Sequence, residues 1–353
     1  MNNEATLYGI KNSNRKSKDF WGKNMFNSSF PVGLANYMRD SNKKAVYITL
    51  KEDLTPQTGY ISIDEAYNAV GIRTDDLYFA FEHKFTPYEE YSYDPIDGVD
   101  LVIKTLSGNF LRPLEVKLTV LPDSATFRRV QEKWGSEIVI RPATTSYCAL
   151  GIADAIKEKT SSVRKIFEPD CSKIRDWGNE SEMSVVLPKV LELINLFERE
   201  YIQIQKPFIL QPIWKTLGQN PIIAEDAFDI FVWSDLAFTR LFLDRSSFNG
   251  GLKGITRHMR STARLARFLY EFSRSGKVGL NDIYRQMTFD LQTDKEFSAN
   301  GSVTNKYMSS PRLIKPVVAR NELYNIILGG GEELLMPERR FDQSIYFTMK
   351  RNS

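Results

Sequence analysis

The chain has 353 residues, of which 42% are hydrophobic and 26% charged, and its net charge is only +3. These values describe an ordinary globular protein that can form one large domain or two. The sequence has no apolar stretch of the roughly 20 residues that a membrane span needs, no signal-peptide pattern in MNNEATLYGI, and too few cysteines and histidines for a typical zinc site. We therefore expect a cytoplasmic protein with no membrane partner and no small-molecule cofactor.

The first predicted elements are short. Residues from Ile63 to Val70 form a predicted helix with Ser62 as its cap, and the apolar run from Leu77 to Phe81 is a predicted strand. The segment from Lys11 to Lys23, ahead of both, is basic. An arm that contacts phosphates and a frayed terminus predict the same composition, so both interpretations stay open.

The next segment has the pattern of a β-hairpin. The run from Val99 to Ile103 is rich in β-branched residues, and apolar and polar residues alternate from Leu114 to Val120. Gly108 and Asn109, which lie between the two runs, suit the backbone of a tight turn. We therefore predict two antiparallel strands joined by a turn at these residues.

This hairpin is predicted to carry charge on one face. If the turn is centred between Gly108 and Asn109, Asp100 lies opposite Lys117, Val102 lies opposite Glu115, and all four share a face. Asp97 is then expected on the other face, and Pro113 could shift the register through a bulge. Asp100 is therefore preferred to Asp97 as the partner of Glu115.

Two carboxylates beside a lysine suit one kind of chemistry. Asp100 and Glu115 offer the oxygen ligands that Mg²⁺ prefers, and such a metal can also contact a phosphate. The ammonium group of Lys117 can orient an attacking water or offset negative charge in the transition state. The set predicts phosphodiester hydrolysis, with Glu82 as a possible additional acid.

The Glu-x-Lys tripeptide is weak evidence by itself. A second copy occurs at Glu82-His83-Lys84, but Asp75 and Asp76 lie too close to it for an intervening turn and return strand. A solvated salt bridge at the hairpin is the competing interpretation. The context of the hairpin therefore carries more weight than the tripeptide.

The order of the elements around the hairpin indicates a fold. A helix is predicted from Ser124 to Trp134 and a strand from Glu137 to Arg141, which completes the order αβββαβ. This order resembles the PD-(D/E)xK nuclease core, in which the motif acid matches Asp100 and the Glu-x-Lys matches Glu115 and Lys117. No proline precedes Asp100 directly, so Asp97 stays a second candidate for the motif acid.

The wider sequence resembles type II restriction endonucleases, most closely the HindVP-type family. The resemblance rests on four stretches: FWGKNMFNSSFPVGLANYMRD, LRPLEVKLTVLPD, AFDIFVWSDLAFTRLF and RSTARLARFLYEF. It implies an α/β fold with a central mixed sheet and a Mg²⁺-dependent homodimer that cuts double-stranded DNA at a short palindrome of the GRCGYC kind. It also implies a nuclease core with an N-terminal arm in residues 1–160 and a mostly helical region for DNA binding, specificity and dimerisation in residues 161–353, unless both form one continuous domain.

Two apolar segments follow the core. Residues from Glu182 to Gln205 have helical periodicity, and Pro188 should kink this helix or delay its start. Residues from Ala224 to Leu243 are predicted to form a second, strongly apolar helix. Neither segment suggests a cofactor pocket.

Positive charge is concentrated further along the chain. Residues 245 to 277 contain eight Lys or Arg and one acid, a net charge of +7 in a chain that carries +3. Helical spacing aligns a stripe of arginines with the apolar residues opposite: Arg257, Arg260, Arg264, Arg267 and Arg274. We expect this stripe to face outward and contact the DNA backbone, together with Lys253 in the glycine-rich approach. A plain solvated face is the alternative.

Residues that read bases are harder to identify. The polar loop from Ser298 to Ser310 offers Asn300, Asn305 and Lys306, and Arg312 follows it. Asparagine pairs with adenine and arginine with guanine, although an ordinary surface loop has the same composition. A structure-specific repair or recombination nuclease and a non-catalytic DNA-binding protein stay open as alternative functions.

Overall fold

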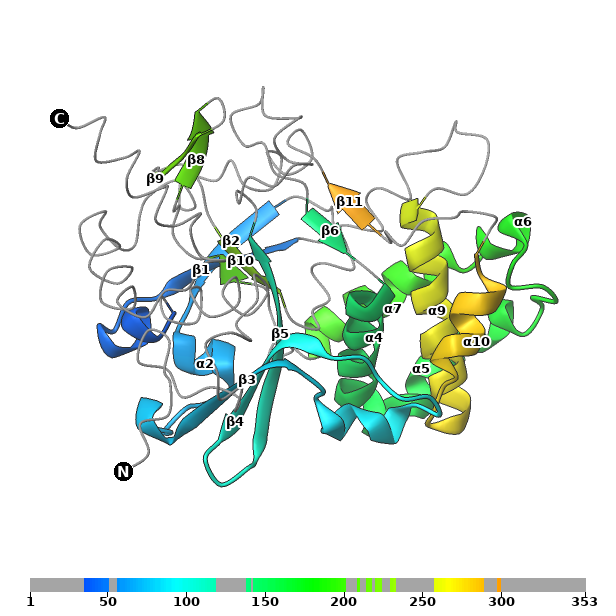
Figure 1. Ribbon diagram of the computed structural model, residues 1–353. Coiled ribbons are helices and arrows are strands. Elements are labelled where there is room, and N and C mark those ends of the chain that lie inside the picture. The colour runs from blue at the N-terminus through cyan, green and yellow to red at the C-terminus, as the bar shows by residue number, and fades with distance from the viewer. Residues whose placement is uncertain are drawn as a thin grey trace.

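A computed structural model describes residues 35–50, 56–118, 138–140, 142–200, 208–209, 214–217, 220–223, 229–232, 257–288 and 297–299. The strands of the main sheet occupy one side of the molecule and the longer helices gather on the other (Figure 1). The expectation of an α/β protein is therefore confirmed.

The main sheet has seven strands in the order β2-β1-β7-β10-β5-β4-β3. They are β1 (Ala45–Leu50), β2 (Pro56–Ile61), β3 (Leu77–His83), β4 (Val99–Thr105), β5 (Phe110–Leu118), β7 (Phe208–Ile209) and β10 (Asp229–Val232). All pairings that the structure describes in this sheet are antiparallel, whereas the family resemblance implied a mixed sheet. The motif strand β5 lies in the interior of the sheet, between β10 and β4.

The predicted strand near residue 138 joins a different sheet. Strand β6 (Ile138–Ile140) pairs with β11 (Phe297–Ala299), and β8 (Trp214–Leu217) pairs with β9 (Asn220–Ile223). The helix predicted from Ser124 to Trp134 lies outside the described residues. The three strands of the predicted αβββαβ order that precede this helix are present, but β6 does not extend the seven-stranded sheet.

The first helix is set by its cap. Helix α2 (Ile63–Tyr67) begins after Ser62, whose hydroxyl accepts a hydrogen bond from the Glu65 amide while the Glu65 carboxylate accepts one from the Ser62 amide. This capping box satisfies two donors that would otherwise lack partners. The helix ends at Asn68, in the left-handed region with φ 55°, which is earlier than the predicted Val70.

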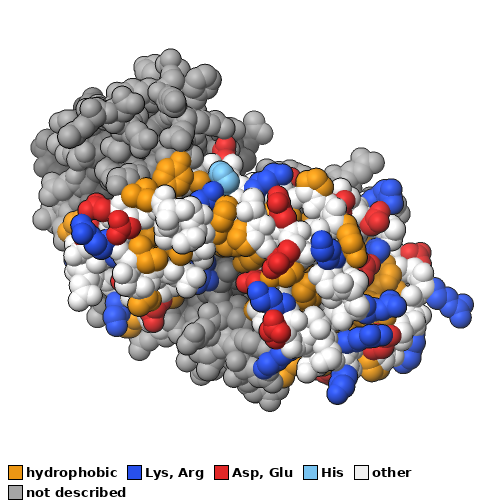
Figure 2. Space-filling view, turned by 90° about the horizontal axis from the view of Figure 1, so that it is seen from below, with side chains coloured by type: hydrophobic (Ala, Val, Ile, Leu, Met, Phe, Trp, Pro, Cys, Tyr) orange, Lys and Arg blue, Asp and Glu red, His pale blue; other side chains and the backbone are white. Residues whose placement is uncertain are grey.

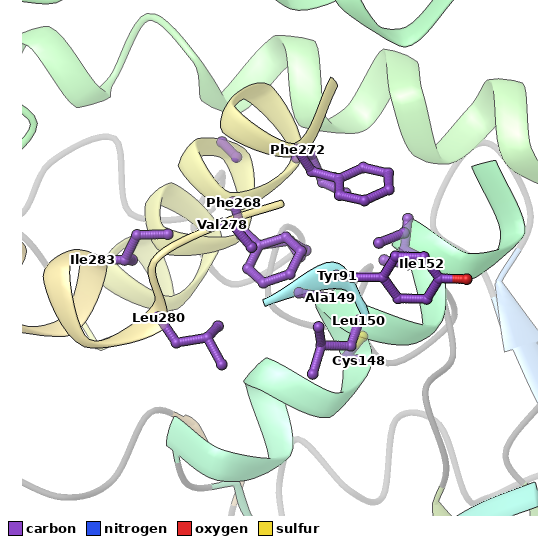
Figure 3. Close-up of a cluster of buried hydrophobic side chains, with 14 of the residues drawn as sticks. Tyr91, Cys148, Ala149, Leu150, Ile152, Phe268, Phe272, Val278, Leu280 and Ile283 are labelled. Atoms are coloured by element: carbon purple, nitrogen blue, oxygen red, sulfur yellow. The ribbon is translucent and has the colours of Figure 1, made fainter. Parts of the chain in front are cut away.

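The helical side of the molecule is built around one long central helix, α9 (Arg257–Ser275). It packs against α4 (Pro142–Ile156), α5 (Thr160–Cys171), α7 (Leu187–Glu200) and α10 (Leu280–Gln286). Figure 3 shows Phe268 and Phe272 of α9 beside Leu150 and Ile152 of α4 and Tyr91. Removal of this apolar surface from water is the main force that holds the helices together.

One prediction about the middle of the chain is confirmed and another is wrong. Helix α7 begins at Leu187, with Pro188 in its first turn, after the short helix α6 (Glu180–Met183), so the proline delays the helix as expected. The predicted helix from Ala224 to Leu243 instead contains strand β10, while the residues around this strand lie outside the described ones. A short buried apolar run has the same hydrophobicity in a strand as in a helix, so periodicity could not separate them.

The hydrophobic core extends across the predicted domain boundary at residue 160. A single cluster of buried side chains includes Val102 of β4, Ile152 of α4, Val190 of α7 and Phe272 of α9. The division into two regions stays a prediction, and the cluster favours one continuous unit. Every helix among the described residues is too short or too polar to span a membrane.

Both cysteines, Cys148 and Cys171, are buried thiols. Desolvation raises the pKa of the Cys171 thiol to about 12, with Asp170 and Glu168 adding to the effect. Because the thiolate is the reactive form, we expect negligible alkylation of the folded protein by iodoacetamide at pH 8 and labelling of both thiols in denaturant. Mass spectrometry measures this, and fast labelling of native Cys171 would contradict the placement of α5.

Candidate active site

The predicted hairpin is present, but its register differs by two residues from the prediction. Leu101 pairs with Leu114 rather than with Val116, because the turn begins earlier and the Thr105 amide donates to the Asn109 carbonyl at 2.8 Å. Gly108 adopts φ 94° in this turn, a conformation that glycine tolerates without strain.

A bulge then adjusts the pairing of β4 with β5. Lys104 pairs with Phe110 and Ile103 pairs with Arg112, so Leu111 is the extra residue. Beyond the bulge, the register of β5 against β4 differs from the predicted register by two residues. Because side chains alternate between the two faces of a strand, a shift of two residues keeps each side chain on its predicted face. Only the residues that lie directly opposite one another change.

Three acids lie near one end of three neighbouring strands. The last described pair of β4 with β5 is Leu101 with Leu114, and Asp100 and Glu115 each lie one position beyond it in adjacent strands. On the other side of β4, Phe81 pairs with Leu101 and His83 with Val99, and Glu82 of β3 lies between these two paired residues.

The backbone at this end of the sheet is unusual. Glu82 has φ 46°, a left-handed conformation that glutamate rarely adopts. A Cβ atom added to Gly98 would lie 3.3 Å from the Glu82 carbonyl oxygen, so a glycine is what allows this close approach. Strained conformations of this kind concentrate at functional sites.

The structure places the remaining motif residues as follows. Lys117 lies two residues after Glu115 in the same strand, where it pairs with Ile230 of β10. Asp97 is exposed and lies just before β4. The adjoining segment is tethered to the start of α10, because Asp94 accepts hydrogen bonds from the Asn281 amide at 3.0 Å and from its Nδ2 at 2.9 Å.

Helix α4 contributes two contacts that the sequence did not suggest. The Thr144 hydroxyl donates to Oε1 of Glu115 at 3.0 Å. The Tyr147 hydroxyl donates to the backbone carbonyl of Asp97 at 2.6 Å and accepts from the Phe85 amide at 3.2 Å. A single threonine or tyrosine has no recognisable sequence pattern, and Pro142, which is typical of a first helical turn, was the available signal.

The environment of Tyr147 reflects the acids around it. Burial raises its pKa to about 12, the hydrogen bond from Phe85 lowers it, and the charges of Asp97, Glu115 and Glu89 raise it further. Tyr147 therefore stays protonated at neutral pH and acts as a hydrogen-bond donor. Glu115 of β5 and the Asp97 backbone just before β4 thus both contact the first half of α4.

The donors present suit a hard divalent cation. Asp100 and Glu115 supply carboxylate oxygens from adjacent strands, and Mg²⁺ is often held by one or two carboxylates together with phosphate oxygens of its substrate. Within the described part of the chain, no three His, Cys, Asp or Glu residues form a group that could hold a metal ion. The pair therefore fits a metal that is shared with a nucleic-acid substrate.

The arginine stripe does not lie on the surface as expected. Arg260 is 0% exposed, and Arg264 and Arg267 are each 7% exposed, whereas Arg274 is exposed. Arg264 donates from Nε and Nη2 to the Met287 carbonyl at 3.1 and 2.8 Å. The prediction of a solvent-facing stripe is therefore wrong for these three residues, because α9 is surrounded by other helices.

Aromatic rings, a backbone carbonyl and one acid accommodate two of these guanidinium groups. Arg264 lies over the ring of Tyr284 at 4.7 Å, and burial lowers its pKa to about 10, so it stays charged at neutral pH. Arg267 donates to Glu271 at 2.7 Å and lies 5.7 Å from the Trp177 ring. These partners satisfy charge that would otherwise be costly to bury.

Other predicted DNA contacts cannot be placed. Arg257 begins α9, and its side chain lies outside the described ones. The described residues also exclude five other predicted contacts and the basic segment from Lys11 to Lys23. These five are Lys253, Asn300, Asn305, Lys306 and Arg312. On the face seen in Figure 2, acidic and basic side chains are interspersed, in agreement with ion pairs such as Arg164 with Glu168.

Comparison with known proteins identifies the family. The chain matches the HindVP restriction endonuclease family over residues 21–351. It is 38% identical over 349 residues to the type II restriction enzyme HgiDI of Herpetosiphon aurantiacus, with 98% of this chain and 96% of that protein covered. It is 34% identical over 348 residues to the probable type II restriction enzyme HindVP of Haemophilus influenzae, with 98% and 94% covered.

No solved structure matches the chain significantly. The family resemblance inferred from the sequence is confirmed, since both relatives align over nearly the whole chain. The chain belongs to the HindVP restriction endonuclease family, whose members are type II restriction enzymes.

Proposed function

We propose that this chain is a Mg²⁺-dependent endonuclease that hydrolyses both strands of double-stranded DNA at a short palindromic site. The observation that carries the proposal is the position of Asp100 and Glu115 on adjacent strands, each one residue beyond the paired Leu101 and Leu114, with Lys117 in the same strand as Glu115. The family assignment supports a DNA substrate. The same residue set supports a PD-(D/E)xK type of active site, with the motif strands in an antiparallel sheet.

The proposed roles follow from the chemistry of the side chains. Asp100 and Glu115 would hold Mg²⁺, and Asp97 and Glu82 are additional candidate acids, of which Glu82 is favoured because its strand neighbours Phe81 and His83 pair with the two residues that flank Asp100. When bound, the metal stabilises negative charge on the scissile phosphate. Lys117 would orient the attacking water by hydrogen bonding and offset charge in the transition state. In this reaction the water oxygen would bond to phosphorus as the bond from phosphorus to the leaving oxygen breaks. The attacking water would lose a proton to solvent, and the leaving oxygen would take up a proton from solvent.

A palindromic site supports a homodimer. Two strands related by a two-fold axis present identical scissile bonds, and a two-fold symmetric dimer supplies one active site to each. The family resemblance suggests a six-base-pair sequence of the GRCGYC kind. Arg274 and Arg257 of α9 remain candidates for backbone contacts, together with Lys253, Asn300, Asn305, Lys306 and Arg312.

Incubation of the purified protein with plasmid DNA and Mg²⁺ tests the proposed function. We expect discrete fragments whose sequenced ends define one palindrome, no cleavage in EDTA, and recovery of cleavage when Mg²⁺ is restored. Cleavage confined to branched or damaged DNA would instead indicate a structure-specific nuclease. Binding without cleavage would indicate a DNA-binding protein in which the hairpin charges only form a salt bridge.

A further inference from the structure

The first turn of α4 lies against the motif strand. Thr144 is the third residue of this helix, and its hydroxyl donates to Oε1 of Glu115 at 3.0 Å. Both residues are partly buried, so the bond is shielded from much of the competing water. A glutamate side chain has several rotatable bonds, and a donor on one carboxylate oxygen restricts the positions that the other can take.

The same face of α4 also contacts the segment just before β4, which contains Asp97. Tyr147 follows Thr144 by three residues, so the two side chains lie on one face of α4. Its hydroxyl donates to the Asp97 carbonyl at 2.6 Å, three residues before Asp100. One face of α4 therefore contacts both the segment that precedes β4 and the acid of β5.

The start of α4 is itself held in place. The Pro142 carbonyl accepts hydrogen bonds from the Tyr284 hydroxyl at 2.7 Å and from the Ser146 hydroxyl at 3.0 Å. Arg264 lies over the Tyr284 ring and donates to the Met287 carbonyl. A connected set of contacts thus runs from α9 and α10 to the turn that carries Thr144. Hydroxyl groups on a rigid support are suited to orient a ligand side chain.

We propose that Thr144 is a positioning residue for the metal site, because its hydroxyl orients the Glu115 carboxylate. This inference rests on the proposed function, in which Glu115 holds Mg²⁺. Thr144 acts through Glu115 and has no assigned contact with DNA or metal. Residues that hydrogen-bond to a metal ligand fix its orientation, and their loss commonly weakens metal affinity or activity by about 10- to 100-fold.

Two substitutions of Thr144 distinguish the effect of its hydroxyl group from the effect of its branched shape. Thr144→Val removes the donor and keeps the branched side chain, whereas Thr144→Ser keeps the donor. We expect Mn²⁺ binding, measured by electron paramagnetic resonance with a non-hydrolysable DNA duplex bound, to weaken about 10-fold or more in Thr144→Val and to stay within about 3-fold of wild type in Thr144→Ser. The Mg²⁺ concentration for half-maximal plasmid cleavage should rise in parallel.

Thr74→Val is the matched control, because the Thr74 hydroxyl donates to Asp40 at 3.0 Å, which is the same kind of bond away from the site. It should leave metal affinity unchanged whatever its effect on stability. If Thr144→Val does not fold, Thr144→Ala takes its place against Thr144→Ser. Equal Mn²⁺ affinity in wild type and the donor-free variant would overturn the positioning role. Absence of Mg²⁺-dependent cleavage by the wild type would instead overturn the proposed function.

Discussion

Glu115→Gln and Lys117→Met are each expected to reduce the rate of DNA cleavage by at least about 100-fold, while binding of the same DNA in EDTA changes little. Glutamine keeps the size of the Glu115 side chain but removes the charge that holds the metal. Methionine keeps the length of Lys117 but removes the ammonium group that would orient water. Single-turnover cleavage of a short duplex that contains the site measures the loss of rate, and a gel-shift titration measures binding.

The second Glu-x-Lys tripeptide provides a control within the same chain. Lys84 is exposed after β3, and Lys84→Met should leave the cleavage rate within about 3-fold of wild type, because surface substitutions usually have small effects. Wild-type rates in both Glu115→Gln and Lys117→Met would refute the site assignment. A large loss in Lys84→Met with little loss in Lys117→Met would move the site to the end of β3.

Arg264→Met is expected to lower the free energy of unfolding by about 3 kcal/mol. The substitution removes two charged hydrogen bonds to the Met287 carbonyl and the contact with the Tyr284 ring, and it leaves a buried carbonyl without these donors. Urea unfolding followed by circular dichroism measures the change. A loss below about 0.5 kcal/mol would mean that Arg264 is not buried in the folded protein.

Arg274 offers the matching exposed substitution. Arg274→Met should change stability by no more than about 0.5 kcal/mol, since this side chain is exposed on the last turn of α9. If Arg274 contacts a phosphate, its loss should also reduce the slope of log binding constant against log salt by about one. An unchanged salt slope would remove Arg274 from the DNA-contact set.

The same comparison explains why the arginine stripe was misplaced. Helical spacing correctly aligned Arg260, Arg264 and Arg267, but spacing does not reveal what lies opposite that face. The partners of Arg264 and Arg267 come from the Trp177 segment, from α10 and the residue after it, and from α9 itself. A charged stripe therefore predicts a solvent-facing surface unless distant segments are known to supply a carbonyl group and aromatic rings.

The sequence by itself determined the local features of this protein. Alternation predicted β5, glycine and asparagine predicted the turn, Ser62 predicted the start of α2, and Pro188 predicted a kink or a delayed start for α7. Each of these depends on neighbouring residues and backbone preferences, so the pattern contains the necessary information. The family assignment rests on many positions along the chain and was likewise available from sequence alone.

Tertiary structure decided which segments meet. The bulge at Leu111 set the register in which Leu101 pairs with Leu114, and strand β10 proved to be the neighbour of β5 rather than part of a helix. The hydroxyl that donates to Glu115 belongs to Thr144, in a helix that begins after the motif strands in the chain. Pairing between strands and contacts between distant segments depend on the free energy of the whole packed chain, whereas secondary-structure preference depends on a few adjacent residues.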